Sequence, residues 1–534
     1  MANKSKFQAI KGTRDLLPPE TQLWNHVEQT AHEVFATFGF GEIRLPIFEP
    51  TELFARSVGQ DTDIVGKEMY TFFDHRVQNL EALRGEVVRW HQDVVGVRDV
   101  TIFTAAVRTF LRGVEQALET RQLDRTSSMQ ANYDALRALL VQTEQNAAGV
   151  NATIEDVDAE ISLLRPQLLI AVQNFTFGES VSLRPEATAS VCRAYIEHGM
   201  QQLPQPVKLY YMGPMFRRER PQKGRYRQFY QIGAEILGGS DAPAIDAELI
   251  EMLMTFFDKL ELQGLQLEVN SIGCRECRPR YVELLRAELL KVKDKLGPDS
   301  QRRIETNPLR VLDSKLESEQ PIIATLPHIA DHLCEDCAKH YAAVKQHLEL
   351  RGVIYRENWR LVRGLDYYMR TTFEITAQGL GSQNAVCGGG RYDGLVELLG
   401  GPPTRGIGFA IGEDRLILSL QESLPAQAGG RGQVQQSRDV YIAWMGEHAY
   451  AAAIRAAKDL RKAGFSVELP PTEQKFGKAL GQADKLGAKY ALILGDNEVS
   501  EALWTLKTLS DGTQQKFTES DLLGFLRQHE KMSS

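Results

Sequence analysis

The chain has 534 residues, of which 43% are hydrophobic and 25% charged, proportions typical of a globular protein with roughly two to four domains. Its net charge of −8 argues against a protein that coats nucleic acid by neutralising phosphates broadly, and six cysteines in so long a chain exclude a disulfide scaffold. No apolar run approaches the roughly 18 residues of a membrane span, and the first residues lack the apolar core of a secretory signal, so we expect a cytoplasmic protein.

The N-terminal part predicts one helix and three strands. Residues 21–38 carry apolar side chains at helical spacing and are followed by Gly39. Residues 41–50 predict a strand that Pro46 interrupts, which suits an edge or an interface better than the centre of a sheet. We expect the next strand at residues 65–75 and its return at residues 174–190.

About 100 residues separate those last two strands. Residues 75–177 show helical periodicity in four blocks, which predicts a helical hairpin or small bundle inserted into a β-turn. This insertion contains ten arginines, no lysine and thirteen acidic residues, so its net charge is −3. An arm that grips RNA would be basic, so we favour a packing or oligomerisation element, whose function the residues do not reveal. The four predicted helices are at residues 80–95, 101–122, 129–146 and 153–164.

Two segments after the insertion each allow a structural and a functional interpretation. Glu186 precedes a helix that begins near Thr188, so it is either an acid stabilised by the helix dipole or a carboxylate that receives a substrate ammonium. Residues 210–235 predict a hairpin whose turn carries six cations. The hairpin is either a solvated surface element or an anion site with an acid deep in a pocket. On the return strand, alternation places five side chains on one face: Arg227, Phe229, Gln231, Gly233 and Glu235.

Four of the cysteines form two Cys-x-x-Cys pairs. Cys274 and Cys277 form the first pair, and Cys334 and Cys337 form the second. Four thiolates in chelating pairs are what a tetrahedral structural zinc requires, although 56 residues between the pairs exceed the usual zinc-ribbon interval. The alternatives are a structural Zn²⁺ ion or reduced free thiols.

Three later segments contain potential ligand-binding groups, and two of them predict a strand beside an arginine. Arg363 precedes a glycine turn and an aromatic, β-branched strand. Residues 385–400 contain three consecutive glycines, which we expect to let the backbone approach a flat ligand closely. Residues 404–418 predict a strand, a break at Gly412 and a helix, in whose first turn Arg415 is unfavourable to the helix dipole and suited to a phosphate.

Residues 421–438 are rich in glycine, glutamine and alanine and predict a linker. From residue 439 to 534, strands alternate with helices, which indicates a small α/β domain with a mostly parallel sheet.

The hairpin sequence FRRERPQKGRYRQFYQ resembles motif 2 of the histidyl-tRNA synthetases, which are class II aminoacyl-tRNA synthetases. LRPEAT, RGLDYY with its following threonine and FE, and GIGFAIGEDRLIL also resemble motifs of this family and occur in the family's order. The resemblance implies an α+β fold: an antiparallel-sheet catalytic domain with helices (residues 1–74 and 178–420), which contains a helical subdomain (271–350), followed by an anticodon-binding domain (439–534). It covers nearly everything except the insertion at residues 75–177.

The resemblance also implies a reaction and its groups. Histidine and ATP, with Mg²⁺, would form histidyl-adenylate, and the histidyl group would pass to tRNA(His); the residues at 21–50 would contribute to a homodimer interface. The alternatives are a non-catalytic regulatory subunit of ATP phosphoribosyltransferase and an RNA-binding structural module. The implied catalytic residues are Arg217 and Arg363, which with Arg415 also bind ATP. The implied histidine-binding residues are Glu186, Ala187, Thr188, Gln231, Glu235, Tyr367 and Tyr368, and the implied tRNA acceptor contacts are Gln222, Lys223 and Arg225.

Overall fold

The computed structural model divides the chain into two compact units. One unit comprises Met1–Thr13 and Glu33–Ser419, and the other comprises Arg14–His32 and Leu420–Ser534. The structure describes residues 7–59, 62, 64–73, 78–93, 100–119, 127–147, 166–173, 175, 180–377, 385–423 and 438–530.

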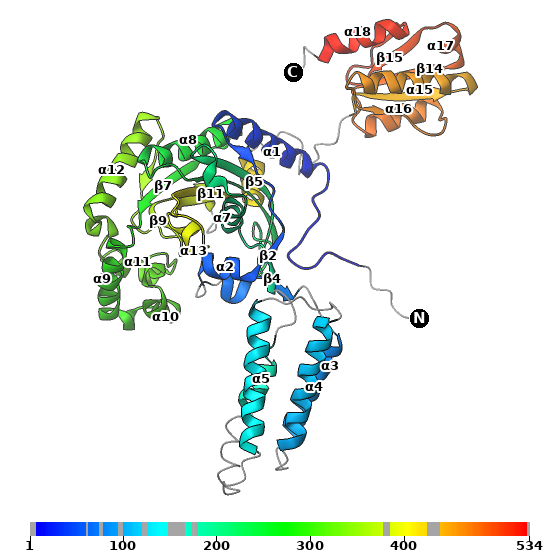
Figure 1. Ribbon diagram of the computed structural model, residues 1–534. Helices are drawn as coiled ribbons and strands as arrows, with labels where there is room; N and C mark the ends of the chain where they lie inside the picture. Colours follow the sequence, from blue (N-terminus) through cyan, green and yellow to red (C-terminus); the bar gives the residue numbers. More distant parts are fainter. Residues whose placement is uncertain are drawn as a thin grey trace. The chain divides into compact units, whose positions relative to one another are not determined.

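The larger unit is built on an eight-stranded sheet (Figure 1). Every neighbouring pair is antiparallel except the two pairs at the edges, where a two-residue strand lies parallel to its neighbour. This is the mainly antiparallel sheet that the sequence predicts. In spatial order the strands are β1 (Gly41–Glu42), β5 (Val207–Phe216), β6 (Gln228–Leu237), β11 (Gly406–Gly412), β10 (Ala385–Arg391), β9 (Met369–Ala377), β7 (Leu265–Ser271) and β8 (Arg356–Glu357).

Aromatic packing closes one face of this sheet. Phe35, near the end of α1 (Glu20–Thr37), lies with its ring centroid 5.5 Å from that of Tyr210, 5.6 Å from Phe256 of α8 (Pro243–Lys259) and 6.0 Å from Phe409. Successive side chains of a strand point to opposite faces. The residues that follow or precede these aromatic residues on β5 and β11 therefore face the other side of the sheet, where the candidate site lies.

A three-stranded antiparallel sheet holds the segments around the insertion. Its order is β2 (Phe48–Pro50), β4 (Ser180–Leu183) and β3 (Thr71–Phe73). The strand predicted at residues 41–50 is thus divided between two sheets, because the proline at position 46 cannot continue a ladder. The predicted strand at 65–75 is mostly wrong: Ile64–Glu68 form a π-helical turn, with Met69 N donating to Ile64 O at 3.0 Å. Among the described residues of the stretch predicted as strand at 174–190, Ser180–Leu183 form β4 and α7 (Thr188–Glu197) begins at Thr188.

The insertion contains its own hydrophobic core. Its helices α3 (Gln78–Asp93), α4 (Val100–Glu119) and α5 (Ser127–Ala147) run alongside one another (Figure 1), and residues 166–173 are also helical. The helix predicted at 153–164 lies outside the described residues. The buried members of this core all come from the insertion: Leu80, Val87, Phe103, Val107, Phe110, Leu111, Val114, Ala117, Tyr133, Leu136, Leu140, Leu168, Val172 and Phe175.

A helical subdomain follows β7. Tyr281 and Leu285 of α9 belong to its buried core, and so does Tyr368 from the loop before β9. This core therefore connects the subdomain to one of the predicted site residues. The subdomain comprises α9 (Cys277–Lys291), α10 (Pro298–Thr306), η5 (Pro308–Val311), α11 (Gln320–Ile323) and α12 (Glu335–Leu350), which Figure 1 shows grouped together.

The second unit contains a five-stranded sheet in the order β13 (Val467–Glu468), β12 (Val440–Met445), β14 (Tyr490–Gly495), β15 (Trp504–Thr508) and β16 (Gln514–Phe517). Strands β13, β12 and β14 are parallel to one another, as predicted. Strands β15 and β16 are each antiparallel to the strand before them in this order, so the sheet is mixed. Alternate residues of β12 belong to two separate buried cores, because helices cover both faces. These helices are α15 (Glu447–Lys462), α16 (Phe476–Lys485), α17 (Asp496–Ser500) and α18 (Glu519–Glu530).

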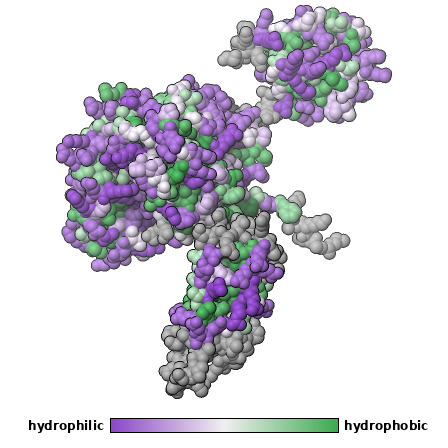
Figure 2. All heavy atoms as spheres, in the orientation of Figure 1, coloured by the Kyte–Doolittle hydropathy of each residue, from purple (hydrophilic) through white to green (hydrophobic). Residues whose placement is uncertain are grey.

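The predicted linker at 421–438 begins within α14 (Glu413–Ser423), and residues 424–437 lie outside the described part of the chain. Figure 2 shows mostly hydrophilic side chains on the visible face of the larger unit, with apolar side chains scattered among them. Within the ranges that the structure describes, none of the helices is long and apolar enough to cross a membrane.

Candidate active site

A cavity of about 350 Å³ lies on the sheet face opposite the Phe35 cluster. Its floor comes from β6, β11, β10 and β9, and its walls come from the start of α7, the tip of the β5–β6 hairpin and the loop at residues 361–368. Segments far apart in sequence therefore meet here. The predicted residues that line the cavity are Glu186, Thr188, Arg217, Arg225, Gln231, Arg363, Tyr367, Tyr368 and Arg415.

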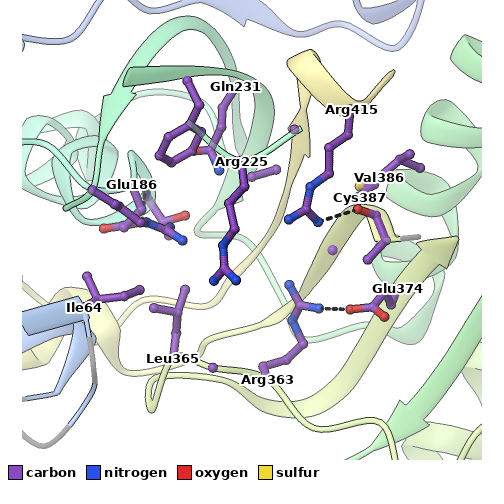
Figure 3. A pocket seen from close by; sticks show the side chains of 18 of the residues that line it. Ile64, Glu186, Arg225, Gln231, Arg363, Leu365, Glu374, Val386, Cys387 and Arg415 are labelled. Atoms are coloured by element: carbon purple, nitrogen blue, oxygen red, sulfur yellow. Dashed lines mark hydrogen bonds and ion pairs between the residues drawn. The ribbon is translucent and has the colours of Figure 1, made fainter. Parts of the chain in front are cut away.

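Arginines from separate elements converge on one part of this cavity. Figure 3 shows the guanidinium groups of Arg225, Arg363 and Arg415 pointing toward one another. Arg415 donates through Nη1 to Ala385 O at 2.8 Å and through Nε to Gly224 O at 3.2 Å. Burial lowers the pKa of Arg415, and the like charges of Arg225 and Arg217 lower it further. So many cations around one space favour an anionic ligand.

Arg217 stands at the base of the hairpin. Its Nε donates to Pro185 O at 2.9 Å, and its guanidinium carbon lies 5.2 Å from the centre of the Phe229 ring. Burial lowers its pKa. The carbonyl group and the ring hold the guanidinium in one orientation while leaving other N–H groups for a ligand.

Arg363 lies flat against the glycine-rich strand β10. Its Nη1 is 2.9 Å from Glu374 on β9, and its guanidinium carbon lies 5.7 Å from the centre of the Tyr368 ring. A Cβ atom on Gly388 would lie 2.0 Å from Arg363 Nη2, so only glycine leaves room for this side chain. The sequence analysis predicts that this backbone approaches a flat ligand; at Gly388 the group against the backbone is the chain's own Arg363 guanidinium, and the ligand stays a prediction.

Glu186 caps helix α7. The backbone N–H groups of Thr188 and Ala189 donate to its carboxylate at 2.7 and 3.1 Å. Burial raises the pKa of Glu186, while these hydrogen bonds and the charge of Arg217 lower it. The two interpretations of this residue are thus compatible, because the carboxylate stabilises the helix start and also lines the cavity.

Glu235 lies beneath the cavity rather than in its lining. It is 1% exposed, and it accepts hydrogen bonds from the Thr188 hydroxyl at Oε1 and the Tyr392 hydroxyl at Oε2, both at 2.6 Å. Burial raises its pKa to about 8. A Cβ atom on the facing residue Gly408 would lie 1.5 Å from Oε2, so that position requires glycine. Thr188, which does line the cavity, connects this carboxylate to it.

Four buried polar atoms in the cavity lining have no hydrogen-bond partner among the described residues. They are Gln231 Oε1, the Tyr211 hydroxyl, Arg363 Nε and Glu219 Oε2, the last of which is in an ion pair with Arg225. A buried acceptor without a partner costs roughly 1–3 kcal/mol. A polar ligand that donates to Gln231 would remove this cost.

Some predicted residues lie outside the cavity lining, and Arg310 and Tyr392 are among the residues of the site that carry no sequence prediction. Ala187 is fully buried at the start of α7, and Gln222 and Lys223 are exposed at the hairpin tip. Arg310 of η5 lines the cavity, but it lies far in sequence from every recognised motif. Tyr392 lies two residues after the glycine run at 388–390, and only the fold reveals that its hydroxyl contacts Glu235.

The four cysteines meet at the base of the helical subdomain. Their sulfur atoms all lie within 4.8 Å of one another, and Cys274 Sγ is 3.7 Å from Cys277 Sγ and 3.8 Å from Cys334 Sγ. A tetrahedral zinc with Zn–S bonds of about 2.3 Å separates its ligand sulfurs by about 3.8 Å. None of the four is in a disulfide. The donor set and its spacing therefore fit a zinc ion.

Comparison with known proteins identifies the same regions. The family model described as "Histidyl-tRNA synthetase" matches residues 164–277 and 282–416, and the model described as "Anticodon binding domain" matches residues 439–529. The histidine–tRNA ligase of Solibacter usitatus is 43% identical over 517 residues, which are 97% of this chain and 98% of that protein. That of Koribacter versatilis is 43% identical over 527 residues, covering 98% and 96% of the two chains.

A solved structure has the same fold. The crystal structure of apo histidyl-tRNA synthetase from S. aureus is 29% identical, has a TM-score of 0.65, and the match covers 98% of this chain and 100% of that one. The order of the motifs, the arginine-lined cavity and the match over nearly the full length of curated relatives lead to one conclusion. The chain belongs to the histidyl-tRNA synthetase family.

Proposed function

We propose that this chain is a histidine–tRNA ligase. It activates histidine with ATP to histidyl-adenylate, releasing pyrophosphate, and transfers the histidyl group to tRNA(His). The observation that carries the proposal is a single cavity in which arginines from three separate elements lie across from buried carboxylates. Such a cavity suits a reaction between an anionic nucleotide and a cationic amino acid.

The arginines would bind ATP. Arg217 and Arg363 grip the α-phosphate, where charge develops as the histidine carboxylate attacks it, and Arg415 binds the distal phosphates. No side-chain nucleophile takes part, so catalysis consists of positioning and charge stabilisation. Mg²⁺, when bound, would neutralise part of the phosphate charge. The carboxylates of Glu219 and Glu374 in the lining offer the oxygen ligands that Mg²⁺ prefers.

The opposite end of the cavity would bind histidine. Glu186 receives the ammonium group, and the unpartnered Gln231 Oε1 accepts from the same end of the substrate. Tyr367 and Tyr368 wall the imidazole pocket, whose polar partners are the Tyr368 hydroxyl and the carboxylate of Glu235 beneath Thr188. Ala187 supplies the small side chain that the start of α7 needs here. An amino acid without ring nitrogens would leave these buried groups unpaired.

The tRNA would be held in two places. Gln222 and Lys223, exposed at the hairpin tip, and Arg225, in the cavity lining, contact the acceptor end. Residues 439–534 bind the anticodon, as the matching family model suggests. The catalytic domain comprises residues 1–74 and 178–420, the subdomain residues 271–350 and the insertion residues 75–177.

The four-cysteine cluster would hold a structural Zn²⁺ ion. All four ligands are cysteines, which leaves no open position for a substrate, so the metal stabilises the subdomain and takes no part in chemistry. Chain purified without chelators should contain about one zinc per molecule by mass spectrometry of the metal. Absence of zinc would leave the alternative of reduced thiols.

The enzyme would act in the cytoplasm as a homodimer. Exposed apolar side chains on and beside the small sheet support an interface there, since Ile47, Phe48 and Phe72 are 46%, 58% and 44% exposed. Light scattering should give twice the mass of the chain, and Phe48→Glu should lower that mass. A wild-type chain that scatters as a monomer would contradict this assignment.

One assay tests the function. The purified chain with ATP, Mg²⁺, histidine and tRNA(His) should form histidyl-tRNA, and histidine alone should support exchange of pyrophosphate into ATP. A regulatory subunit or an RNA-binding module would do neither. The regulatory alternative is less supported, because curated relatives that match almost the whole chain are named histidine–tRNA ligase.

A further inference from the structure

The four-cysteine cluster is tied to the loop that carries the tyrosines of the candidate histidine pocket. Arg370 N donates to Gly273 O, and Ile272 N donates to Arg370 O, both at 2.8 Å. Gly273 directly precedes Cys274, so the turn with the first cysteine pair is joined to the backbone two residues after Tyr368. Arg370 has a φ of +50°, which a non-glycine residue keeps only where its surroundings hold it.

Arg278 makes a second connection between the same two segments. It is the residue after Cys277 in α9, and its Nη1 donates to the backbone carbonyl oxygen of Tyr368 at 2.6 Å. Burial lowers the pKa of Arg278. Arg278 is half-buried, and a hydrogen bond from a charged guanidinium is among the stronger ones in proteins, so it holds the backbone carbonyl group of Tyr368 in place.

The ring of Tyr368 also depends on α9. Tyr368 belongs to the same buried core as Tyr281 and Leu285 of that helix. A second cavity, of about 430 Å³, lies behind the tyrosine pair and is lined by Cys274, Arg278, Tyr367 and Tyr368 among others. Packing on this side of the tyrosines is therefore incomplete, and their position relies on the contacts from the cysteine turn and Arg278.

We propose that Arg278 and the four-cysteine metal site position the wall of the histidine pocket formed by Tyr367 and Tyr368, so that metal binding sets the affinity for histidine. This inference rests on the proposed function. The metal orients the start of α9 through Cys277, Arg278 transmits that orientation to Tyr368, and neither touches the substrate. Both are positioning elements, and the ATP end of the cavity is left unchanged.

The test compares full-length variants by binding and by kinetics. Arg278→Met removes the hydrogen bond at similar length, Arg278→Lys keeps a donor, Cys274→Ser removes a metal ligand, and the double variant Cys274→Ser/Arg278→Met combines two changes. Arg280→Met is the matched control, because Arg280 is an exposed arginine of the same helix. For each protein we would measure zinc content, histidine affinity by calorimetry and KM for ATP.

Arg278→Met should keep its zinc and weaken histidine binding about tenfold, as expected for loss of a charged hydrogen bond, with KM for ATP within about twofold. Arg278→Lys should recover part of the affinity, and Arg280→Met should match wild type. Cys274→Ser should lose zinc and weaken histidine binding similarly. The double variant should be no weaker than the weaker single variant, because both changes act through one connection.

Unchanged histidine affinity in Arg278→Met would overturn the inference. Three other results would also overturn it. They are equal losses of affinity for histidine and for ATP, a loss of histidine affinity in the double variant equal to the product of the two single losses, and a wild-type chain that binds no zinc. A wild-type chain that binds histidine but charges no tRNA(His) would instead contradict the proposed function, which separates the two failures.

Discussion

At the residue scale, Glu235 is the side chain whose properties depend most on its surroundings. Two hydroxyl groups hold its carboxylate, and burial raises its pKa to about 8. The ionised form that would accept a histidine N–H is therefore costly in the free protein. Such a cost is common where a binding group must be kept in place for its ligand.

Glu235→Gln should weaken histidine use and stabilise the fold at high pH. We expect KM for histidine to rise about tenfold or more, with KM for ATP within about twofold. The folded-state pKa of Glu235 lies above the ordinary value of 4.5. The wild-type protein therefore loses folding stability as the pH rises from 4.5 through 8, where this side chain ionises. The unfolding free energy of Glu235→Gln minus that of wild type should therefore increase with pH in that window, by at most about 1.4 kcal/mol per pH unit.

Denaturant unfolding at pH 5, 7 and 9 and steady-state kinetics measure both effects. Glu283→Gln serves as control, because the Glu283 side chain is 71% exposed. An unchanged KM for histidine, or a stability difference that does not grow with pH, would count against the role of Glu235.

Arg363→Ala should abolish adenylate formation while the protein stays folded. Loss of one preorganised cation at the reacting phosphate is expected to lower the rate at least about 100-fold. Pyrophosphate exchange with histidine measures this rate, and thermal unfolding checks the fold. Arg356→Ala, which removes an exposed arginine of β8, should be close to wild type. Near-normal exchange by Arg363→Ala would show that the assignment is wrong.

At the element scale, strand β10 pairs with two neighbouring strands and also makes room for the side chain of Arg363. It pairs with β9 and β11 through its backbone, as any central strand does. Its glycines also leave the surface above it free of side chains, and the guanidinium of Arg363 occupies that space at Gly388. Glycine at position 388 is therefore needed for the position of a neighbouring side chain, whereas a Cβ on Gly389 would meet the backbone oxygen of Gly408 at 2.4 Å.

Gly388→Ala should displace Arg363 and reproduce much of its loss. The three atoms nearest to the added Cβ all belong to the guanidinium of Arg363, with Nη2 at 2.0 Å, so the end of a flexible side chain has to move. We expect pyrophosphate exchange to fall roughly 100-fold, and Gly388→Ala/Arg363→Ala to be no slower than Arg363→Ala alone. Gly481→Ala is the control, since a Cβ there meets nothing within 4 Å. If the double variant were slower than wild type by the product of the two single losses in exchange rate, this explanation would be wrong.

At the scale of the whole molecule, the insertion is an independent structural unit in energetic terms. The core that it buries uses only residues between Leu80 and Phe175. It enters and leaves through β3 and β4, which pair with each other, so the two ends of the insertion are already close in space. Insertions at such places cost little loop entropy.

Deletion of residues 76–176 should leave adenylate formation within about threefold of wild type. None of the described cavity-lining residues belongs to the insertion. Its net charge of −3 gives it little attraction for RNA, so charging of tRNA(His) should fall no more than exchange does. Exchange, charging and mass by light scattering test this, and a change in mass would assign the insertion to oligomerisation. A selective loss of charging would instead assign it to tRNA.

Local patterns predicted many of the elements because apolar residues recur at a characteristic spacing along a strand or a helix that has one buried face. The hairpin with its basic tip and the α/β unit at residues 439–534 follow from alternation, turn residues and helical spacing, whereas the antiparallel sheet was expected from the family resemblance. The strand predicted at residues 65–75 is wrong up to Glu68, where a short stretch without alternation forms a π-helical turn, and right at Thr71–Phe73.

The family and its motifs were therefore determined by the sequence alone, whereas the partners of each side chain were decided only by the tertiary structure. Periodicity tells which face of an element is buried but not which other element covers it. Nothing local places the hydroxyl of Tyr392 on Glu235, the guanidinium of Arg363 over Gly388, or Arg310 in the cavity. These contacts join residues more than 20 positions apart, and they form because packing of the sheet and subdomain brings their elements together.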